Sequence, residues 1–205
     1  MSGDVEPASA PRRRPRFMED VERLDLAIYA AIARTPTPVL DAAIGHLSRA
    51  ADYSRLSLAS AGLLALTGGR AGRRAATMGL ASLGVTATVA NLAVKPLGRR
   101  RRPDRLAQDV PFARHVRMPS SRSFPSGHSA TAFAFATGVG HVLPAAAVPL
   151  HALAALVAYS RVHTGTHYPA DALAGAMMGT VLAQLTTHAG DRHRRHATLD
   201  SRRAR

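Results

Sequence analysis

Three short segments of the sequence combine residue types that could bind and transfer a phosphoryl group. The first is a basic block, residues 95–103, with Lys95 at one end and arginines at the other. A run of charge alone is typical of a solvated loop or of contacts with lipid head groups. Lys95, however, is the only lysine among 27 basic residues. Proline follows Lys95 and disfavours helical geometry at that lysine. The Lys95 ammonium is therefore expected where the preceding apolar helix ends.

The second segment, residues 124–128, has the sequence Phe-Pro-Ser-Gly-His and directly precedes an uncharged stretch. Proline is favoured at the first position of a helix, and Ser123 is a candidate cap. The backbone N–H groups of Ser126 and Gly127 would then lie at a helix N-terminus, which attracts anions. An ordinary capped helix start accounts for these residues but does not account for His128.

The third segment, residues 160–171, lies between two apolar stretches and contains Arg161, His167 and Asp171. The proline after His167 is typical of a first helical turn, so Asp171 is expected in the opening turn of the last helix. A carboxylate close to an imidazole can hold its tautomer and activate it as a nucleophile. His163 and His167 are four residues apart, but no glutamate lies between them and an arginine lies beside them, so no metal site is expected.

The uncharged stretches between these segments are long enough to form membrane helices. Residues 75–94 and 172–190 carry no formal charge over 20 and 19 positions, and about 20 apolar residues cross a bilayer as a helix. Residues 129–160 are uncharged over 32 positions, and prolines near 142–149 divide them into two helices. Residues 56–69 are a weaker candidate. We expect an all-α membrane bundle of about four or five transmembrane helices; the alternative is a soluble bundle of buried helices.

The two ends of the chain are basic and differ in character from the middle. Residues 1–16 contain four arginines among prolines and small residues and are expected to form a disordered tail, and residues 191–205 have the same character. Residues 17–51 alternate apolar and charged side chains at helical spacing, with prolines before a second short helix. Such an amphipathic region can lie on the membrane surface or pack on neighbouring protein. The expected phosphoryl-transfer domain is therefore residues 17–190, with a transmembrane core at residues 52–190.

The composition excludes several classes of protein. Cysteine is absent, which excludes disulfides, thiolate metal sites and a cysteine nucleophile. The 205 residues carry a net charge of +14 but are 46% hydrophobic, so the chain is not a disordered polycation. The arginines gather in the tails and beside apolar segments, and tryptophan is absent, so nucleic acid is not an expected partner. No apolar segment directly follows the first basic stretch, so no signal peptide is expected.

The three segments resemble the signature of the type 2 phosphatidic acid phosphatase superfamily. That signature is Lys-x6-Arg-Pro, then Pro-Ser-Gly-His, then Ser-Arg-x5-His-x3-Asp, and every spacing is intact in this chain. The matching residues are Lys95, Arg102, Pro103, Pro125, Ser126, Gly127, His128, Ser160, Arg161, His167 and Asp171. The resemblance extends over roughly residues 50–190. The N-terminal region also resembles the phosphatase domain of actinobacterial members, in which such a domain precedes a lipid kinase domain.

The resemblance implies different catalytic roles for two histidines. His167 would attack phosphorus and form a phosphohistidine, with Asp171 orienting it, and His128 would protonate the leaving oxygen. The implied phosphate ligands are Lys95, Arg102, Ser126, Gly127 and Arg161. No metal or other cofactor is implied, because three cations and a helix N-terminus can supply the charge stabilisation that phosphoryl transfer needs.

The function implied is metal-independent hydrolysis of a membrane lipid phosphate or diphosphate, either phosphatidic acid-like or a polyprenyl phosphate. Two other functions stay open: a soluble acid phosphatase or vanadium haloperoxidase relative, and a non-catalytic basic membrane protein that binds anionic lipid. Arginines at residues 70–74 and in the C-terminal tail fall opposite the site, which favours a multi-pass protein of the cell membrane with an outward-facing site. The sequence indicates neither the particular lipid nor the oligomeric state.

Four residues near the signature are expected to have lesser roles. Arg99, Arg100 and Arg101 fall at variable positions of the first segment and are expected to contact only lipid head groups or solvent; the alternative is that they steer anionic lipid to the site. His163 falls outside the specified positions of the third segment and is expected at most to support the site from a distance.

Overall fold

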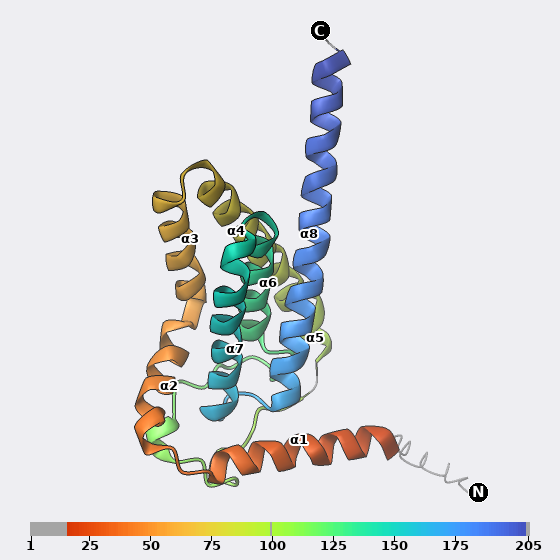
Figure 1. Cartoon of the computed structure of the whole chain (residues 1–205). Coiled ribbons are helices and arrows are strands. Elements are labelled where there is room, and N and C mark those ends of the chain that lie inside the picture. Colours follow the sequence, from red (N-terminus) through yellow and green to blue (C-terminus); the bar gives the residue numbers. More distant parts are fainter. Residues whose placement is uncertain (1–15, 99, 204–205) are drawn as a thin grey trace, which may run out of the picture.

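A computed structural model describes residues 16–98 and 100–203 of the chain. Over these residues all regular secondary structure is helical, which confirms the predicted all-α class (Figure 1). In the central bundle α6 packs against α4, α7 and α8, and α3 packs against α4. The bundle helices are α3 (Arg55–Thr67), α4 (Gly69–Val89), α6 (Gly127–Val142), α7 (Ala147–His163) and α8 (Pro169–Arg203).

The predicted division of residues 129–160 into two helices is confirmed. A short helix, η4 (Pro144–Ala146), joins the end of α6 to the start of α7. A proline lacks the N–H that a continuing helix would use, so the chain turns at Pro144. Because α7 runs back beside α6, it ends near the point where α6 began (Figure 1).

The helix that contains Lys95 differs from the prediction near its end. α4 continues through a wider π-helical turn, η2 (Ala90–Val94), into the short helix α5 (Lys95–Leu97). Lys95 therefore has helical angles (φ −60°, ψ −38°) although proline follows it. The wider turn relieves the conflict between the proline ring and the carbonyl group one turn earlier. The helix still ends two residues after Lys95, so this side chain lies at the end of the bundle, as predicted.

Two N-terminal helices cover that end of the bundle. α1 (Arg16–Arg34) runs across it, and α2 (Pro38–Ala50) leads from α1 toward α3, which confirms two helices separated by prolines (Figure 1). α1 turns Asp25 and Tyr29 toward the bundle, where both are buried. An exposed apolar stripe next to these residues consists of Phe17, Val21, Leu24 and Ile28.

A buried cluster of charged side chains fastens these N-terminal helices to α7. Arg114, at the end of η3 (Phe112–Arg114), donates from Nε to Asp41 Oδ1 at 2.9 Å and from Nη2 to the carbonyl of Thr35. Nε2 of His163 lies 3.0 Å from the same Asp41 oxygen. Buried charges are tolerated when they are paired and hydrogen-bonded. The cluster fixes α2 against α7, and with it the turn that follows α2.

Two glycines, four residues apart, allow α8 to lie directly against α6. A Cβ on Gly175 would be 2.3 Å from the carbonyl oxygen of Ser126, and a Cβ on Gly179 would be 2.0 Å from that of Ala130. These distances are too short for any side chain, so a larger residue would push the helices apart. Small residues at this spacing are typical of close helix pairs in membranes. The contact sets the distance between the first turns of α6 and α8.

The termini differ from the prediction of disordered basic tails. At the C-terminus that prediction is wrong for the described backbone, because α8 continues through Arg203. The residues after Gly190 include alanine, leucine and several arginines, which propagate an existing helix readily. The predicted N-terminal tail, residues 1–16, lies outside the described residues except for Arg16, which begins α1.

Two of the described helices are long and apolar enough to cross a membrane: Gly69–Leu97 and Pro144–His163. Both belong to the bundle. Large apolar side chains on them are exposed, including Val85, Leu92, Val148 and Leu156. An exposed apolar surface of this kind marks contact with lipid or with another protein.

Candidate active site

The three sequence segments converge at one end of the bundle, where α6 and α8 begin and α5 and α7 end (Figure 1). Arg102 lies in the long loop between α5 and α6. Its Nη1 donates to the carbonyl of Thr166 at 2.8 Å, and its Nε donates to the carbonyl of Ser121 at 2.8 Å. These bonds hold the first segment against the third, although the segments are far apart in the chain.

His167 lies in the turn between α7 and α8, and its side chain is buried. Nη1 of Arg102 is 3.1 Å from its Nε2. An arginine has only hydrogen-bond donors, so Nε2 must present a lone pair and the ring proton must lie on Nδ1. This is the tautomer in which Nε2 can act as a nucleophile.

The surroundings of His167 keep its ring uncharged. Its pKa is lowered to about 4, chiefly because burial disfavours the charged ring; Asp171 opposes this effect, and the cations Arg102 and Arg161 reinforce it. The imidazole is therefore neutral near pH 7. Only a neutral imidazole has the lone pair needed to attack phosphorus.

Asp171 lies in the first turn of α8, as predicted, close to His167 but not hydrogen-bonded to it. Its Oδ2 is 3.8 Å from Nδ1 of His167, which is too long for a hydrogen bond. That Nδ1 is buried and has no hydrogen-bond partner within residues 16–98 and 100–203. The groups that do bind the Asp171 carboxylate are Ser123 Oγ, the N–H of Tyr168 and Arg100 Nη1.

Arg100 has a different role from the predicted one. The prediction that it contacts only lipid head groups or solvent is wrong, because Nη1 donates to Asp171 Oδ1 at 3.0 Å and Nη2 donates to Asp25 of α1. The other carboxylate oxygen of Asp25 accepts the N–H of Ala170 at 2.7 Å. Arg100 and Asp25 together tie α1 to the first turn of α8. The arginine is drawn inward because two buried carboxylates there require a cation.

His128 occupies the second position of α6, beside Arg161. Its Nε2 lies 3.0 Å from Oδ1 of Asp52, in the turn η1 (Asp52–Ser54) after α2. The same oxygen is 3.5 Å from Arg161 Nη1, which also donates to the carbonyl and hydroxyl oxygens of Ser48. Nε of Arg161 is buried and has no hydrogen-bond partner in the described part of the chain. Arg161 is thus anchored through Nη1 and keeps Nε available for an anion.

Lys95 and Gly127 lie next to each other at the start of α6. A Cβ on Gly127 would be 3.2 Å from Lys95 Nζ, so the glycine lets the ammonium approach the backbone closely. Both residues and His128 line an open pocket of about 190 Å³. A cation beside the first N–H groups of a helix forms a site suited to an anion.

The cap of α6 is Ser126 and not, as predicted, Ser123. Oγ of Ser126 accepts the N–H of Ser129, while the N–H of Ser126 donates to the carbonyl of Asp171 at 2.9 Å. This bond to α8 holds Ser126 outside the helix, which therefore starts at Gly127. Because Ser126 is fully buried, its hydroxyl and N–H are occupied by the fold, and Gly127 is the better placed backbone donor for a phosphate.

The remaining expectations concern residues at the margin of the site. Arg101 is exposed, Arg99 lies outside the described residues, and His163 contacts Asp41 in the cluster that fastens α2. No group of three or more histidine, cysteine, aspartate or glutamate side chains in the described ranges could hold a metal ion.

Sequence analysis missed two acidic residues at the site: Asp52, which contacts His128 and Arg161, and Asp25, which is linked to Asp171 through Arg100. For Asp25 a signal was present: it lies one helical turn before Tyr29 on the inward face of α1, and carboxylates are rarely buried without a partner. For Asp52 there was none, because its contact with His128 depends on the tertiary packing of α2 against α7.

A search against protein families matches the PAP2 superfamily over residues 75–195. This range contains all three segments and more than half of the chain. The chain belongs to the PAP2 superfamily. Its resemblance to type 2 phosphatidic acid phosphatases is thereby confirmed, whereas Asp25 and Asp52 both precede the range that matches.

The names of curated relatives of this chain describe phosphatases of lipid-linked phosphates. It is 36% identical to the lipid A 1-phosphatase of Rhizobium etli over 103 residues, which are 48% of this chain and 43% of that protein. It is 39% identical to the decaprenylphosphoryl-5-phosphoribose phosphatase of Mycobacterium tuberculosis over 101 residues, 47% of this chain and 51% of that protein. The matches span about half the length of these curated relatives.

Solved structures extend the PAP2 likeness to most of the fold. The crystal structure of Aquifex aeolicus LpxE superposes with a TM-score of 0.64 at 26% identity, covering 80% of this chain and 95% of that one. The transmembrane PAP2 type phosphatidylglycerolphosphate phosphatase of Bacillus subtilis gives 0.63 at 26% identity, covering 84% and 87%. A transmembrane PAP2 phosphatase therefore shares the arrangement of helices described above.

Proposed function

We propose that this PAP2 protein hydrolyses a phosphate monoester or diphosphate on a membrane lipid, without a metal, through a phosphohistidine intermediate. Nε2 of His167 attacks phosphorus while His128 gives a proton to the leaving oxygen. Water then hydrolyses the phosphohistidine and releases phosphate. His167 is the nucleophile because its ring is neutral and its lone pair lies on Nε2.

The observation that carries this proposal is the gathering of three cations around two buried or half-buried imidazoles. Lys95, Arg102 and Arg161 all lie close enough to His128 to act on its charge, and Arg102 also touches His167. Phosphoryl transfer needs mainly positioning and stabilisation of negative charge. Two arginines suit bidentate contact with phosphoryl oxygens, and a lysine supplies a point charge.

We place α3, α4, α6, α7 and α8 across the membrane, with α1 lying along its surface. Support comes from large apolar side chains that are exposed on the outer faces of the bundle. They occur on α3 and α8 as well as on the two helices that are long and apolar enough to cross a membrane. They include Leu58, Leu63 and Leu66 of α3 and Leu173, Met177, Val181 and Leu185 of α8. A water-soluble relative would have to leave this surface in contact with solvent.

The orientation that we propose places the active site on the outer side of the cell membrane. Arg70, Arg73 and Arg74 are exposed in the first turns of α4, at the end of the bundle opposite the site (Figure 1). Arginine and lysine are enriched on the cytoplasmic side of membrane helices.

A narrow apolar cleft leads from the site toward the middle of the bundle. It runs from His128 between α3, α6 and α7, has about 20 Å³ of free space, and is lined mostly by apolar side chains such as Phe135, Leu153 and Val157. The phosphate would lie among the cations, and these helices would have to separate to admit the lipid chain. The names of the curated relatives support a lipid-linked phosphate as the class of substrate.

The test is phosphate release by detergent-purified protein in excess EDTA. The substrates would be phosphatidic acid, phosphatidylglycerol phosphate, a polyprenyl diphosphate, decaprenylphosphoryl-5-phosphoribose and lipid A. We expect EDTA-resistant release that falls by at least about 10³-fold in His167→Ala, since loss of a nucleophile removes the covalent route. His188→Ala is the matched control, because His188 is exposed near the middle of α8, away from the site, and it should retain wild-type activity.

Two outcomes would favour the other functions. Turnover that requires added vanadate would indicate a haloperoxidase, because vanadate should inhibit a phosphatase of this kind. Folded protein that releases no phosphate from any lipid, yet binds anionic vesicles in proportion to its arginines, would indicate the non-catalytic lipid-binding function.

A further inference from the structure

We infer that Asp52 is a positioning residue for His128: its carboxylate holds the Nε2 side of the ring and stabilises the protonated imidazole that acts as general acid. The role rests on the phosphohistidine chemistry proposed above. Asp52 precedes the family match, which begins at residue 75, and it is outside the eleven signature positions.

The contact itself is short and well defined. Oδ1 of Asp52 lies 3.0 Å from Nε2 of His128. An ionised carboxylate only accepts hydrogen bonds, so Nε2 carries a proton directed at Asp52. When the ring takes up a second proton it can only lie on Nδ1, which is the proton available to the leaving oxygen.

The charges around His128 show why such a partner is needed. Cations face it from several elements: Lys95 from α5, Arg102 from the following loop and Arg161 from α7, with the His167 ring also nearby. Burial first, and then each of these cations, disfavours the positive charge on His128 that a general acid must carry. Asp52 is the carboxylate in contact with the ring, so it offsets a field that the phosphate-binding residues themselves create.

The Asp52 carboxylate does not take the position expected for the substrate phosphate. It meets Arg161 at Nη1, the atom that is also bound by Ser48. The buried Nε of Arg161, which lacks a partner among the described residues, remains for the phosphate. Asp52 and a phosphoryl group can therefore be bound at the same time.

The backbone around Asp52 is held in an unusual conformation. The next two residues, Tyr53 and Ser54, both have φ of +57°, a region that side chains other than glycine rarely adopt. Strained residues persist only where the surroundings hold them, and they gather at functional sites. These two residues separate α2 from α3, and Asp52 directly precedes them.

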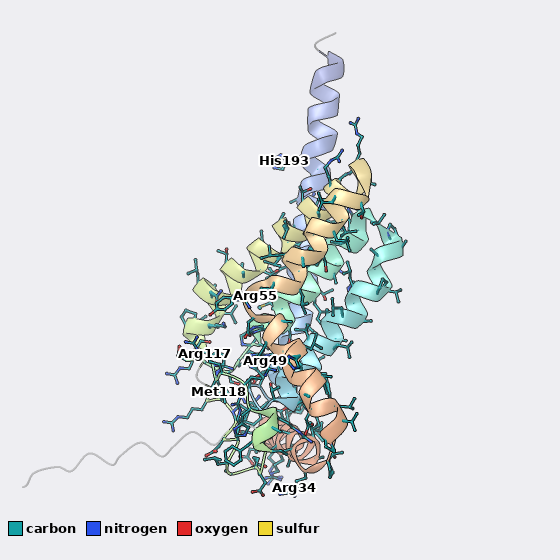
Figure 2. The ribbon with its side chains drawn as sticks, turned by 90° about the vertical axis from the view of Figure 1, so that its left-hand side faces the viewer. Arg34, Arg49, Arg55, Arg117, Met118 and His193 are labelled. Atoms are coloured by element: carbon teal, nitrogen blue, oxygen red, sulfur yellow. The ribbon has the colours of Figure 1, made fainter. Side chains whose placement is uncertain are left out.

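A pocket beside this turn gives the arrangement access to solvent and substrate. Asp52, Tyr53 and His128 line one side of this open pocket of about 340 Å³, and residues 117–121 line the other. Figure 2 shows Arg49 and Arg55, which flank the turn, near Arg117 and Met118 of the facing loop. Asp52 is thus part of the wall of the site and not of the protein interior.

The step that depends on Asp52 is the cleavage of the ester bond. His167 Nε2 forms a bond to phosphorus, the bond from phosphorus to the ester oxygen breaks, and that oxygen takes the proton from His128 Nδ1. In the second step the now neutral His128 accepts a proton from the attacking water, and the bond from phosphorus to Nε2 breaks. Asp52 remains ionised throughout.

The test compares two substrates that differ in their need for a general acid. An alkoxide leaving group, as in dodecyl phosphate, must be protonated, whereas 4-nitrophenolate is stable without a proton. We expect Asp52→Asn to lower kcat/KM for dodecyl phosphate by about 10- to 100-fold, a part of the effect of a general acid. For 4-nitrophenyl phosphate the loss should stay below about 3-fold. The ratio of the two losses does not depend on how much of the variant is folded.

Asp191→Asn is the matched control for Asp52→Asn. Asp191 contacts Nε2 of His141 at 2.9 Å near the opposite end of the bundle, so it is also an aspartate paired with a histidine. It should leave both substrates unaffected. In the background of His128→Ala, Asp52→Asn should cause no further loss with dodecyl phosphate, because Asp52 acts through that ring.

The pH dependence supplies an independent reading of the same role. In Asp52→Asn the alkaline limb of the rate for dodecyl phosphate should move to lower pH, because the protonated ring has lost its carboxylate. Equal losses on both substrates, or an additional loss in the His128→Ala background, would show that Asp52 only supports Arg161 and would overturn the inference. A wild-type protein that releases phosphate from neither substrate would instead contradict the proposed function.

Discussion

Asp171 has more partners than it would need to orient one histidine. Ser123, the N–H of Tyr168 and Arg100 all bind its carboxylate, while His167 lies 3.8 Å away. The carboxylate is therefore fixed in place by groups other than the proposed nucleophile. Arg100 is central to this arrangement, since it also binds Asp25 and so connects Asp171 with α1.

Replacing Arg100 by alanine should lower kcat by about 10- to 100-fold while leaving KM nearly unchanged. The side chain positions Asp171 and makes no contact expected of a phosphate ligand, and small displacements of catalytic groups cost about this much. Steady-state kinetics on 4-nitrophenyl phosphate would measure both parameters.

The control for this variant is Arg101→Ala, which removes the neighbouring and exposed arginine of the same basic block. Its activity should match the wild type. If Arg100→Ala instead raised KM strongly at constant kcat, Arg100 would be a substrate ligand, and its role at Asp171 would be secondary.

The sequence predicts the individual site residues better than their partners. The resemblance to the family signature identifies Lys95, Arg102, His128, Arg161 and His167, because the signature fixes their order and spacing. The partners Asp25 and Asp52 belong to residues 17–52, whose contacts form only when α1 and α2 fold over the end of the bundle. No local pattern in that region specifies which acid meets which base.

At the level of secondary structure, the start of α8 is held against the start of α6 by the two glycines. Replacing Gly175 by alanine would insert a methyl group 2.3 Å from the carbonyl of Ser126. We expect the first turns to separate, which would displace Asp171 relative to His128, lower activity by at least about 10-fold and reduce thermal stability by several degrees. Activity and the melting temperature in detergent would be measured on the same preparation.

Gly62→Ala is the matched control, because a Cβ at Gly62, in α3, would meet nothing within 4 Å. Alanine favours a helix over glycine by about 1 kcal/mol, so this variant should be as stable as the wild type or more so. A Gly175→Ala protein with unchanged activity and stability would show that the two helices can separate without consequence for the site.

The limits of the helices follow from the sequence where charges and prolines mark them, and less well elsewhere. The break at Pro144 was predictable because proline cannot continue a helix. The cap at Ser126 was not, because its N–H is held by a carbonyl of α8, a contact between distant residues. The length of α8 was not predictable either. The arginine-rich composition after Gly190 is typical of a disordered tail, yet arginine continues a helix readily once one has started.

On the scale of the whole molecule, the start of α4, which carries Arg70, Arg73 and Arg74, lies at the end of the bundle far from the candidate active site (Figure 1). The proposed orientation can be tested directly, because the chain contains no cysteine. A single cysteine at Ser120, which is exposed near the site, should react with a membrane-impermeant maleimide in intact cells. A cysteine at Ala71, exposed at the opposite end, should react only after the cells are permeabilised.

The reverse labelling pattern would place the site on the cytoplasmic side while leaving the proposed chemistry intact. Labelling of both positions in intact cells would contradict a bundle that crosses the membrane. Each single-cysteine protein should retain phosphatase activity, which shows that the labelled molecules are folded.

α8 is longer than a bilayer is thick and is not interrupted by proline. At about 1.5 Å per residue its 35 residues extend for about 50 Å, whereas the hydrocarbon layer of a bilayer is about 30 Å thick. No proline interrupts the helix between Ala170 and Arg203, so it has no hinge of the usual kind. Asp171 and the last turns lie at the two ends of one continuous helix. If α8 crosses the bilayer as proposed, a force applied to its C-terminal turns would reach Asp171 without passing through any other element.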